Sequence, residues 1–272
     1  MPKVQKKLRM LCELLGTVAG WRGFVELCRL VAYHGLCRWI RWPHSGRMFP
    51  VHIRSLNGGR VYCRVGTCDI GVLHATFVKQ YHVPPDDLRG VQTIIDLGSN
   101  IGLTVAHYAC LFPNARILGI ELDADNLRVC RKNIAAYGDR CEVLHGAAWF
   151  QSGAVSYTAE QRDGSLVSAA GYHIALEREQ IKGTVPAYTI STLIQKLGPP
   201  LVDFVKIDIE GAEQPVLVAG KGWVPAIRCL KVEIHEPYTL RECISVLERF
   251  GLNCQIDQRH PACVVARNLA AW

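Results

Sequence analysis

The chain has 272 residues, of which 49% are hydrophobic and 20% charged, a composition that excludes a disordered protein and allows one large domain with a shorter appendage. The net charge of +7 resides in the first 50 residues, which contain nine Lys and Arg and only two Glu, while basic and acidic residues cancel in the remainder. A broadly basic surface for nucleic acid is therefore not expected, and no nucleic-acid partner is predicted.

Apolar stretches and cysteines bear on the cellular compartment. No apolar stretch reaches the roughly 18 uninterrupted residues of a membrane span, and none near the start leads to a small-residue cleavage site. The twelve cysteines fall at irregular spacings without a CxxC pair, which favours reduced thiols over a disulfide scaffold or a zinc ribbon. These features predict a cytoplasmic protein.

Residues 1–48 are predicted to be a basic amphipathic helical segment. Apolar residues at spacings of three and four predict a helix over residues 3–18, with a stripe formed by Val4, Leu8, Leu11, Leu15 and Val18. A second apolar-rich helix is expected from Phe24 to about Ile40. Two roles are open for this segment: peripheral docking on anionic lipid at the inner membrane surface, or packing on the core or across a homodimer contact.

Residues 49–90 are predicted to form a second part, a β-hairpin followed by a helix. Apolar residues alternate over residues 51–57, Asn57-Gly58-Gly59 supplies a turn, and residues 61–65 supply the returning strand. The stretch from Asp69 to Tyr81 is predicted to be helical and ends before Pro84.

Residues 91–272 alternate buried strands with helices, which predicts an α/β fold with a doubly wound, mostly parallel, Rossmann-like sheet. Seven strands are expected, at residues 93–96, 116–121, 142–147, 202–208, 229–234, 254–257 and 262–266. Helices are expected at residues 101–111, 124–137, 189–197, 212–219 and 239–250. The stretch 158–185 is the least regular part and is a candidate active-site loop.

The first strand of this third part runs directly into a glycine-containing turn, with the pattern D-x-G-x-N-x-G from Asp96 to Gly102. A dinucleotide site would have a further glycine where this chain has Asn100. S-adenosylmethionine carries no phosphate, so its loop must instead accept an amino-acid moiety and a ribose. Glycines at 98 and 102 would allow close approach of such a ligand. Glu121 ends the next strand, where a carboxylate can accept both ribose hydroxyls, so the unit predicts an S-adenosylmethionine site.

A second group of charged residues follows the strand at 202–208. Lys206, Asp208 and Glu210 cluster at its carboxyl end, beside the glycine-containing turn. The next strand ends in the run Glu233-Ile234-His235. A buried lysine beside these acids requires pairing, because an isolated buried charge is costly.

Four runs, in this order and spacing, resemble the FkbM-type family of S-adenosylmethionine-dependent methyltransferases. They are IIDLGSNIGL, IELD, DFVKIDIEGAE and KVEIH, and the preceding RVGTCDIGVL and KQYHVPP resemble the lead-in of many members. The resemblance implies a class I methyltransferase-like fold and methyl transfer to a hydroxyl of a sugar, glycolipid or natural product. It implies cofactor contacts at Asp96, Gly98, Ser99, Asn100, Gly102, Glu121 and Leu122, and an acceptor side at Asp208 and Glu210.

Three roles are open for the charged residues on the acceptor side. His235 is the preferred general base, because histidine titrates near neutrality. Asp208, Glu210 and His235 could instead hold Mg²⁺, which would lower the pKa of an acceptor hydroxyl. The third role is pairing of the acids with Lys206 or Lys231 and capping of the following helix.

Two alternative functions also stay open. A nicotinamide-dependent oxidoreductase shares the strand, loop and acid arrangement, although Asn100 replaces the middle glycine and no hydride-transfer partner is evident. A non-catalytic cofactor-binding protein could retain the same methyltransferase core.

Overall fold

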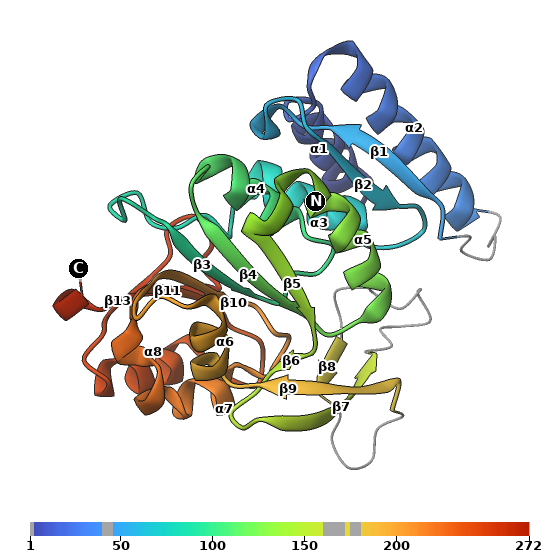
Figure 1. Ribbon diagram of the computed structural model, residues 1–272. Helices are drawn as coiled ribbons and strands as arrows, with labels where there is room; N and C mark the ends of the chain where they lie inside the picture. The colour runs from blue at the N-terminus through green and yellow to red at the C-terminus, as the bar shows by residue number, and fades with distance from the viewer. Residues whose placement is uncertain (1–2, 40–45, 160–171, 175–180, 272) are drawn as a thin grey trace.

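The structure, a computed structural model, describes residues 3–39, 46–159, 172–174 and 181–271 (Figure 1). An N-terminal unit, a central sheet and a smaller second sheet make up these residues. The central sheet positions the candidate site, and the other two parts border it.

The N-terminal unit combines two helices with a β-hairpin. Its elements are α1 (Lys3–Leu15), α2 (Gly20–Trp39), β1 (Met48–His52), the short 3-10 turn η1 (Arg54–Leu56) and β2 (Arg60–Arg64). The strands pair antiparallel from Met48↔Arg64 to His52↔Arg60, so the predicted hairpin forms. Its first strand lies at residues 48–52 rather than 51–57, because residues 54–56 form the turn η1. α2 begins at Gly20, four residues ahead of the expected start at Phe24.

The apolar stripe predicted on α1 is divided between the core and the surface. Val18 is buried and Leu11 packs against the core, but Leu8 is 57% exposed and Leu15 is 40% exposed. Leu14, outside the predicted stripe, is fully buried instead. The core-facing side of α1 therefore runs through residues 10, 11 and 14. The helix ends at Leu15 rather than at residue 18, and Val18 instead forms an isolated antiparallel bridge with Ile53.

The predicted segments 1–48 and 49–90 share one apolar core. Leu14, Leu27 and Leu30 from the helices lie in the same cluster as Val51 and Val61 from the hairpin. The cluster also includes side chains of the helices that follow the first two central strands. The N-terminal unit is therefore attached to the central sheet by apolar packing.

The helix predicted over residues 69–81 is divided. α3 (Asp69–His74) continues into a π-helical turn, η2 (Ala75–Lys79), and Gln80 then adopts a left-handed conformation. Single π-turns of this kind are frequent at functional sites. The buried Arg64–Asp69 ion pair, at 2.9 Å, holds the start of α3 against the hairpin.

The central sheet has seven strands in the order β12-β13-β11-β10-β3-β4-β5, which confirms the predicted class I methyltransferase-like fold. The strands are β3 (Thr93–Leu97), β4 (Arg116–Glu121), β5 (Cys141–His145), β10 (Val202–Ile207), β11 (Ile227–Glu233), β12 (Asn253–Ile256) and β13 (Cys263–Arg267). β13 runs antiparallel between β11 and β12, while the pairs from β11 to β5 are parallel. The strand order changes direction at β3, where open α/β sheets bind ligands.

Helices cover both faces of the central sheet (Figure 1). They are α4 (Leu103–Leu111), α5 (Ala124–Ile134) with the 3-10 segment η3 (Ala135–Arg140), α6 (Ile190–Leu197), α7 (Glu213–Val218) and α8 (Leu240–Arg249). Successive strand residues point to opposite faces, so Ile94 packs in a cluster with α4 and α5, whereas Ile95 packs with α6 and α8. Three short 3-10 segments complete the fold, η4 (Gly220–Gly222), η5 (Val224–Ala226) and η6 (Leu269–Ala271).

A four-stranded second sheet replaces the irregular stretch that the sequence indicated. Its strands are β6 (Ala147–Ala148), β7 (Gly153–Ala159), β8 (Tyr172–Ile174) and β9 (Gly183–Tyr188), in the order β6-β9-β7-β8. The expected active-site loop at 158–185 therefore includes ordered strands, and its residues 160–171 and 175–180 lie outside the described residues. The strand predicted at 142–147 stops at His145, because the chain turns at Gly146 into this second sheet.

Candidate active site

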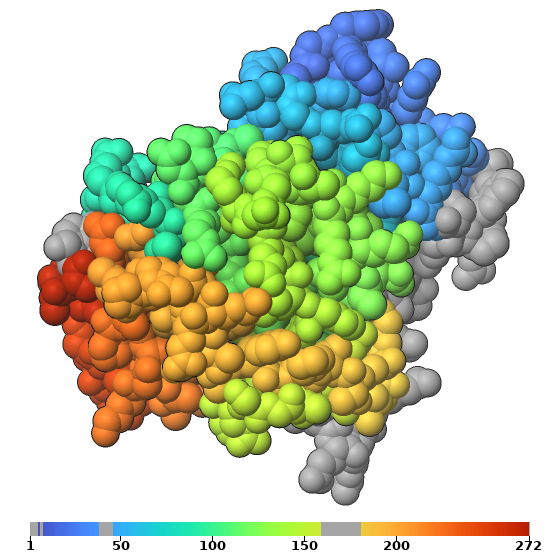
Figure 2. All heavy atoms as spheres, viewed as in Figure 1, coloured from blue at the N-terminus to red at the C-terminus, as the bar shows by residue number. Residues whose placement is uncertain are grey.

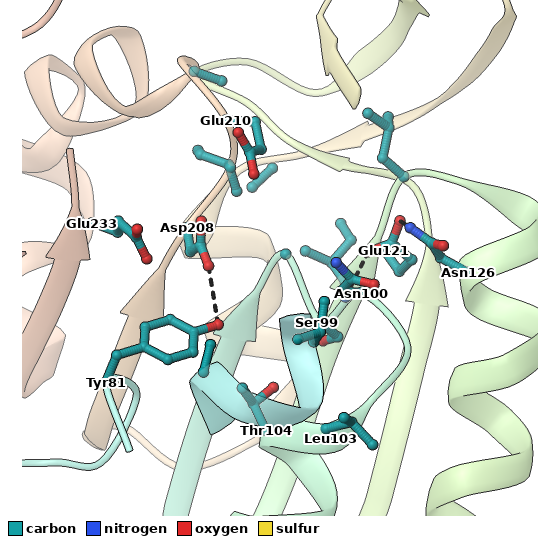
Figure 3. Close-up of a pocket in the computed structure, with 18 of the residues that line it drawn as sticks. Tyr81, Ser99, Asn100, Leu103, Thr104, Glu121, Asn126, Asp208, Glu210 and Glu233 are labelled. Atoms are coloured by element: carbon teal, nitrogen blue, oxygen red, sulfur yellow. Dashed lines mark hydrogen bonds between the residues drawn. The ribbon is translucent and has the colours of Figure 1, made fainter. Parts of the chain in front are cut away.

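A cavity of about 310 Å³ opens at the carboxyl ends of β3, β4, β10 and β11. Its wall includes Gly98, Ser99 and Asn100 after β3, Glu121 and Leu122 at the end of β4, Asn126 of α5, Asp208 and Glu210 after β10, and Glu233 of β11. Figure 3 shows two polar ends: Asn100, Glu121 and Asn126 lie at one, and Tyr81, Asp208, Glu210 and Glu233 at the other. Five of the seven residues predicted for the cofactor, and Asp208 and Glu210 predicted for the acceptor side, thus meet in one cavity.

Gly98 lets the turn after β3 cross the end of β10. Its φ is +83°, and a Cβ built on it would lie 1.8 Å from the carbonyl oxygen of Asp208. The backbone N–H of Asp208 donates in turn to the carbonyl of Leu97, at 3.1 Å. The close approach that requires glycine is therefore made by the protein's own backbone, whereas the sequence had suggested a ligand.

Gly102 and Asp96 support the loop from behind the cavity wall. A Cβ on Gly102 would lie 2.6 Å from Cys130 Sγ, so this glycine admits α5 close to α4. Asp96 is fully buried and accepts a 2.6 Å hydrogen bond from Thr104 Oγ1. Neither residue lines the cavity, unlike the other predicted cofactor residues.

Glu121 is the anchor of the cofactor end. Its carboxylate accepts the backbone N–H of Asn100 at 2.7 Å and that of Asp123 at 2.8 Å. Burial raises the pKa of Glu121 to about 7, against the effect of these N–H groups. Asn126 Nδ2 donates to the same carboxylate at 3.4 Å. Each carboxylate oxygen has two lone pairs, so one site remains on Oε2 to accept a ligand hydroxyl.

Asn100 adds an unsatisfied group to the same wall. Its Oδ1 is buried and has no hydrogen-bond partner among the described residues. Its φ of 49° is left-handed, which asparagine tolerates better than most residues. An acceptor without a partner beside Glu121 suits the hydroxyl or ammonium donors of S-adenosylmethionine, so the residues fit this cofactor.

Asp208 lies in a network of opposite charge. Its Oδ2 accepts from Lys206 Nζ at 3.1 Å and from the Tyr81 hydroxyl at 3.3 Å. Burial alone would raise the pKa of Asp208, but Lys206 and His235 outweigh burial and hold the pKa below its ordinary value. Lys206 also approaches Asp96 at 3.5 Å, so the lysine pairing expected from the sequence is present.

Two further carboxyl groups of the cavity have raised pKa values. Burial, and then the negative charge of Asp208, raise the pKa of Glu210 to about 8 and that of Glu233 to about 7. Glu210 has a left-handed φ of 51°, a conformation that costs energy for a non-glycine residue and often marks a functional site. Both groups titrate where a general base at neutral pH is most effective.

His235 lies behind this group of acids and does not line the cavity. Its Nδ1 is 2.9 Å from Oε1 of the buried Glu213, and its Nε2 is 3.6 Å from Glu210 Oε2. Burial alone would lower the pKa of His235, but Glu213, Asp208 and Glu210 raise it to about 9. The ring is therefore protonated near neutral pH, a state that suits a fixed positive charge rather than a general base.

The residues proposed from the sequence to hold Mg²⁺ do come together. Ligand atoms of Asp208, Glu210 and His235 lie within 4.8 Å of one another. Mg²⁺ prefers oxygen ligands, which the two carboxylates offer. However, Lys206 and the protonated His235 already provide the positive charge that a metal ion would bring. The geometry thus offers oxygen ligands for a cation and, at the same place, the charge pairing expected from the sequence.

Several lining residues escaped the sequence reasoning. Tyr81 and His260 come from loops outside the strand ends, and Cys68, Gly71, Val72 and Ala75 come from α3 and its surroundings. Glu233 lies on the same strand face as the buried Lys231, which indicates that its side chain also points inward. The sequence instead favours His235, from the same run, as the general base. The lead-in segment therefore forms one wall of the site.

Comparison with known proteins gives the family. Residues 96–252 match the model of the family described as "Methyltransferase FkbM domain". A curated relative, the O-methyltransferase imqG of Aspergillus flavus, is 44% identical over 63 residues, which is 22% of this chain and 26% of the relative. The chain thus matches about a quarter of that relative's length.

Two solved structures are distantly similar to this chain. The Methanococcus jannaschii fibrillarin pre-rRNA processing protein is 14% identical, with a TM-score of 0.41 over 82% of this chain and 81% of its own. The precorrin-6y C5,15-methyltransferase of Geobacter metallireducens is 13% identical, with a TM-score of 0.40 over 66% of this chain and 84% of its own.

Proposed function

This chain belongs to the FkbM family of S-adenosylmethionine-dependent methyltransferases, and on that premise we propose that it methylates a hydroxyl oxygen of a sugar, glycolipid or related natural product. One observation carries the proposal. The cavity that includes Glu121 also includes two carboxyl groups, Glu210 and Glu233, with pKa values near 8 and 7. An oxygen acceptor must lose a proton, and these groups are suited to take it.

In this proposal Glu121 and Asn100 bind the ribose and amino-acid ends of the cofactor, and Ser99, Leu122 and Asn126 complete that end of the cavity. The acceptor lies at the other end, where Asp208, Tyr81 and Glu233 offer hydrogen-bonding groups to its hydroxyls (Figure 3). Bound S-adenosylmethionine supplies an activated sulfonium methyl group. The protein aligns the acceptor oxygen with that group, which replaces a bimolecular encounter by an intramolecular one.

Glu210 is the general base of this proposal. It accepts the hydroxyl proton as the acceptor oxygen forms its bond to the methyl carbon and the carbon–sulfur electron pair returns to sulfur. Asp208 keeps the pKa of Glu210 high, while His235 opposes that effect. In this proposal Glu210 is the general base in place of His235, which the sequence favoured, and His235 is a positioning residue.

A labelling experiment tests the proposed function. The protein is incubated with S-adenosylmethionine carrying a labelled methyl group and with fractionated sugars, glycolipids and natural products. We expect label in an alkali-stable ether on an oxygen and equimolar S-adenosylhomocysteine. Label on nitrogen or carbon would contradict the hydroxyl assignment.

Replacement of Glu121 should weaken cofactor binding and change its pH dependence. Glu121→Ala should raise the Kd for S-adenosylhomocysteine by about 10- to 150-fold, because a charged hydrogen-bond acceptor contributes about 1.5–3 kcal/mol. The folded pKa of about 7 implies that wild-type affinity rises with pH up to 7 and then levels off, since the charged carboxylate accepts a ribose hydroxyl more strongly than the protonated acid does. Calorimetry from pH 6 to 8 measures both effects, and Glu121→Gln should lack this pH dependence. If the affinity of Glu121→Gln depends on pH as strongly as that of the wild-type protein, Glu121 does not bind the ribose.

Chelation should leave the reaction unaffected. Lys206 and His235 already balance the charge of Asp208 and Glu210, so turnover should change by less than about twofold after EDTA treatment or added Mg²⁺. Methyl transfer is measured after dialysis against EDTA, with and without 5 mM Mg²⁺ (about that level suffices for weak sites). Loss of turnover that Mg²⁺ restores would return these residues to the metal interpretation.

A further inference from the structure

The outer face of α2 is an exposed apolar surface on the N-terminal unit. Residues 21, 24, 28, 32 and 36 follow helical spacing and are all exposed, and they are Trp21, Phe24, Cys28, Ala32 and Leu36. Trp21 is 77% exposed, Leu36 46% and Phe24 36%, and the rings of Trp21 and Phe24 stack at 5.2 Å. We call these five residues the outer α2 stripe.

The opposite side of α2 already has its packing partners. Leu27 and Leu30 are buried against the hairpin in the N-terminal core. A surface helix normally has one apolar and one polar side, and a helix with apolar residues on both sides needs a second environment to bury them. The outer stripe therefore requires a covering that the described residues do not supply.

The charges around the stripe indicate the chemistry of that covering. Arg22 and Arg29 are exposed at its edge, and the first 50 residues contain nine Lys and Arg. Within those 50 residues only Glu13 and Glu26 oppose them, and each of the two carboxylates contacts a histidine and an exposed arginine. Glu26 binds His52 Nδ1 at 2.6 Å and Arg22 at 3.4 Å, and Glu13 binds His74 at 2.7 Å and Arg9 at 3.0 Å.

We propose that the outer α2 stripe docks on an anionic lipid bilayer, with the aromatic pair Trp21 and Phe24 in the headgroup region and Arg22 and Arg29 against lipid phosphates. A basic helix with exposed aromatic residues gains both apolar burial and attraction to anionic headgroups in this position. No described helix is long and apolar enough to cross a membrane, so the contact is peripheral. The proposal rests on this surface alone and does not depend on the identity of the acceptor.

The position of the stripe permits such contact. The N-terminal unit, in blue, projects at one end of the molecule, away from the end formed by α7 and α8 (Figure 2). α1 and the turn η2 pack together through the N-terminal core, and α3 contributes to the cavity wall.

Vesicle flotation of the full chain tests the proposal. Probes are vesicles of phosphatidylcholine alone and of phosphatidylcholine with 30% phosphatidylglycerol, about the anionic fraction that gives a strong surface potential. The protein should float with the anionic vesicles at low salt and stay unbound with the neutral ones. Trp21→Ser combined with Phe24→Ser should lower the partition coefficient by at least about tenfold, and Arg29→Gln by about fivefold.

Matched controls come from exposed apolar residues elsewhere. Val218 is 56% exposed and Ile256 is 48% exposed, so Val218→Ser with Ile256→Ser removes comparable surface far along the chain and should leave flotation unchanged. S-adenosylhomocysteine binding in each variant verifies the fold. A folded wild-type protein that fails to float would overturn the proposal. Equal flotation with neutral vesicles would also overturn the proposal. So would a wild-type dimer that dissociates in the Trp21→Ser, Phe24→Ser double variant, because the stripe would then be a contact between two copies of the chain.

Discussion

Glu210→Gln should lower kcat at pH 7 by about 10²-fold or more while the Kd for S-adenosylmethionine changes by less than about twofold. A general base acts only in the transition state, so its loss lowers turnover and spares ground-state binding. Glu210 lines the acceptor end of the cavity, whereas Glu121 anchors the other end. Steady-state kinetics with the acceptor found by labelling, together with calorimetry, measure the two effects.

The pH profile distinguishes Glu210 from its neighbours. In wild-type protein the carboxylate form increases as pH rises to the folded pKa of about 8, so kcat should rise to that pH and then level off. His235→Asn removes a positive charge that lowers the pKa of Glu210, so the rising limb should move to higher pH. Glu233→Gln is the matched control in the same cavity. If that variant loses turnover and Glu210→Gln retains it, Glu233 is the base.

The fold was largely predictable because its signals are local and periodic. The strand Arg116–Glu121 has the predicted bounds, since a continuous apolar run ending in an acid marks a buried parallel strand. The turn from Gly98 to Gly102 and the acid at Glu121 lie at adjacent strand ends, which places them in one cavity without knowledge of side-chain packing. The cofactor end was therefore predictable from spacing.

The acceptor end was harder to predict because burial determines its chemistry. His235 titrates near neutrality in water, but Glu213 is buried beside it and keeps it protonated. The contact depends on how α7 packs beneath the end of β11, which spacing does not reveal. The sequence does not distinguish Glu210 from any other acidic residue after a strand. Its raised pKa arises from burial beside Asp208.

Tyr81 illustrates a contribution that periodicity cannot detect. It follows a π-turn and a left-handed Gln80, and this irregular path brings its hydroxyl to 3.3 Å from Asp208. The sequence indicated a regular helix there, which would direct the side chain differently. Non-local packing across more than a hundred residues joins it to β10.

Gly98→Ala should destabilise the fold strongly and disrupt the cofactor site at the same time. The new Cβ would lie 1.8 Å from the carbonyl oxygen of Asp208, and neither group belongs to a flexible side chain. Steric relief requires β3 and β10 to separate at the edge that carries the cofactor loop. Overpacking and a left-handed alanine together should lower the free energy of unfolding by about 3–5 kcal/mol and Tm by about 6–15 °C. Cofactor binding should no longer be detectable.

Gly90→Ala separates the steric overlap in Gly98→Ala from the cost of a left-handed alanine backbone. Gly90 has a φ of +66°, but a Cβ there would meet nothing within 4 Å, so alanine adds only the cost of the left-handed backbone. It should lower stability by about 1–2 kcal/mol and leave cofactor affinity unchanged. Thermal unfolding and calorimetry of both variants provide the comparison. If the two variants unfold at the same temperature, the close approach of the β3 turn to Asp208 does not constrain the site. A larger loss in Gly98→Ala, with cofactor binding abolished, would show that the contact between β3 and β10 holds the cofactor end and the acceptor end of the cavity in register.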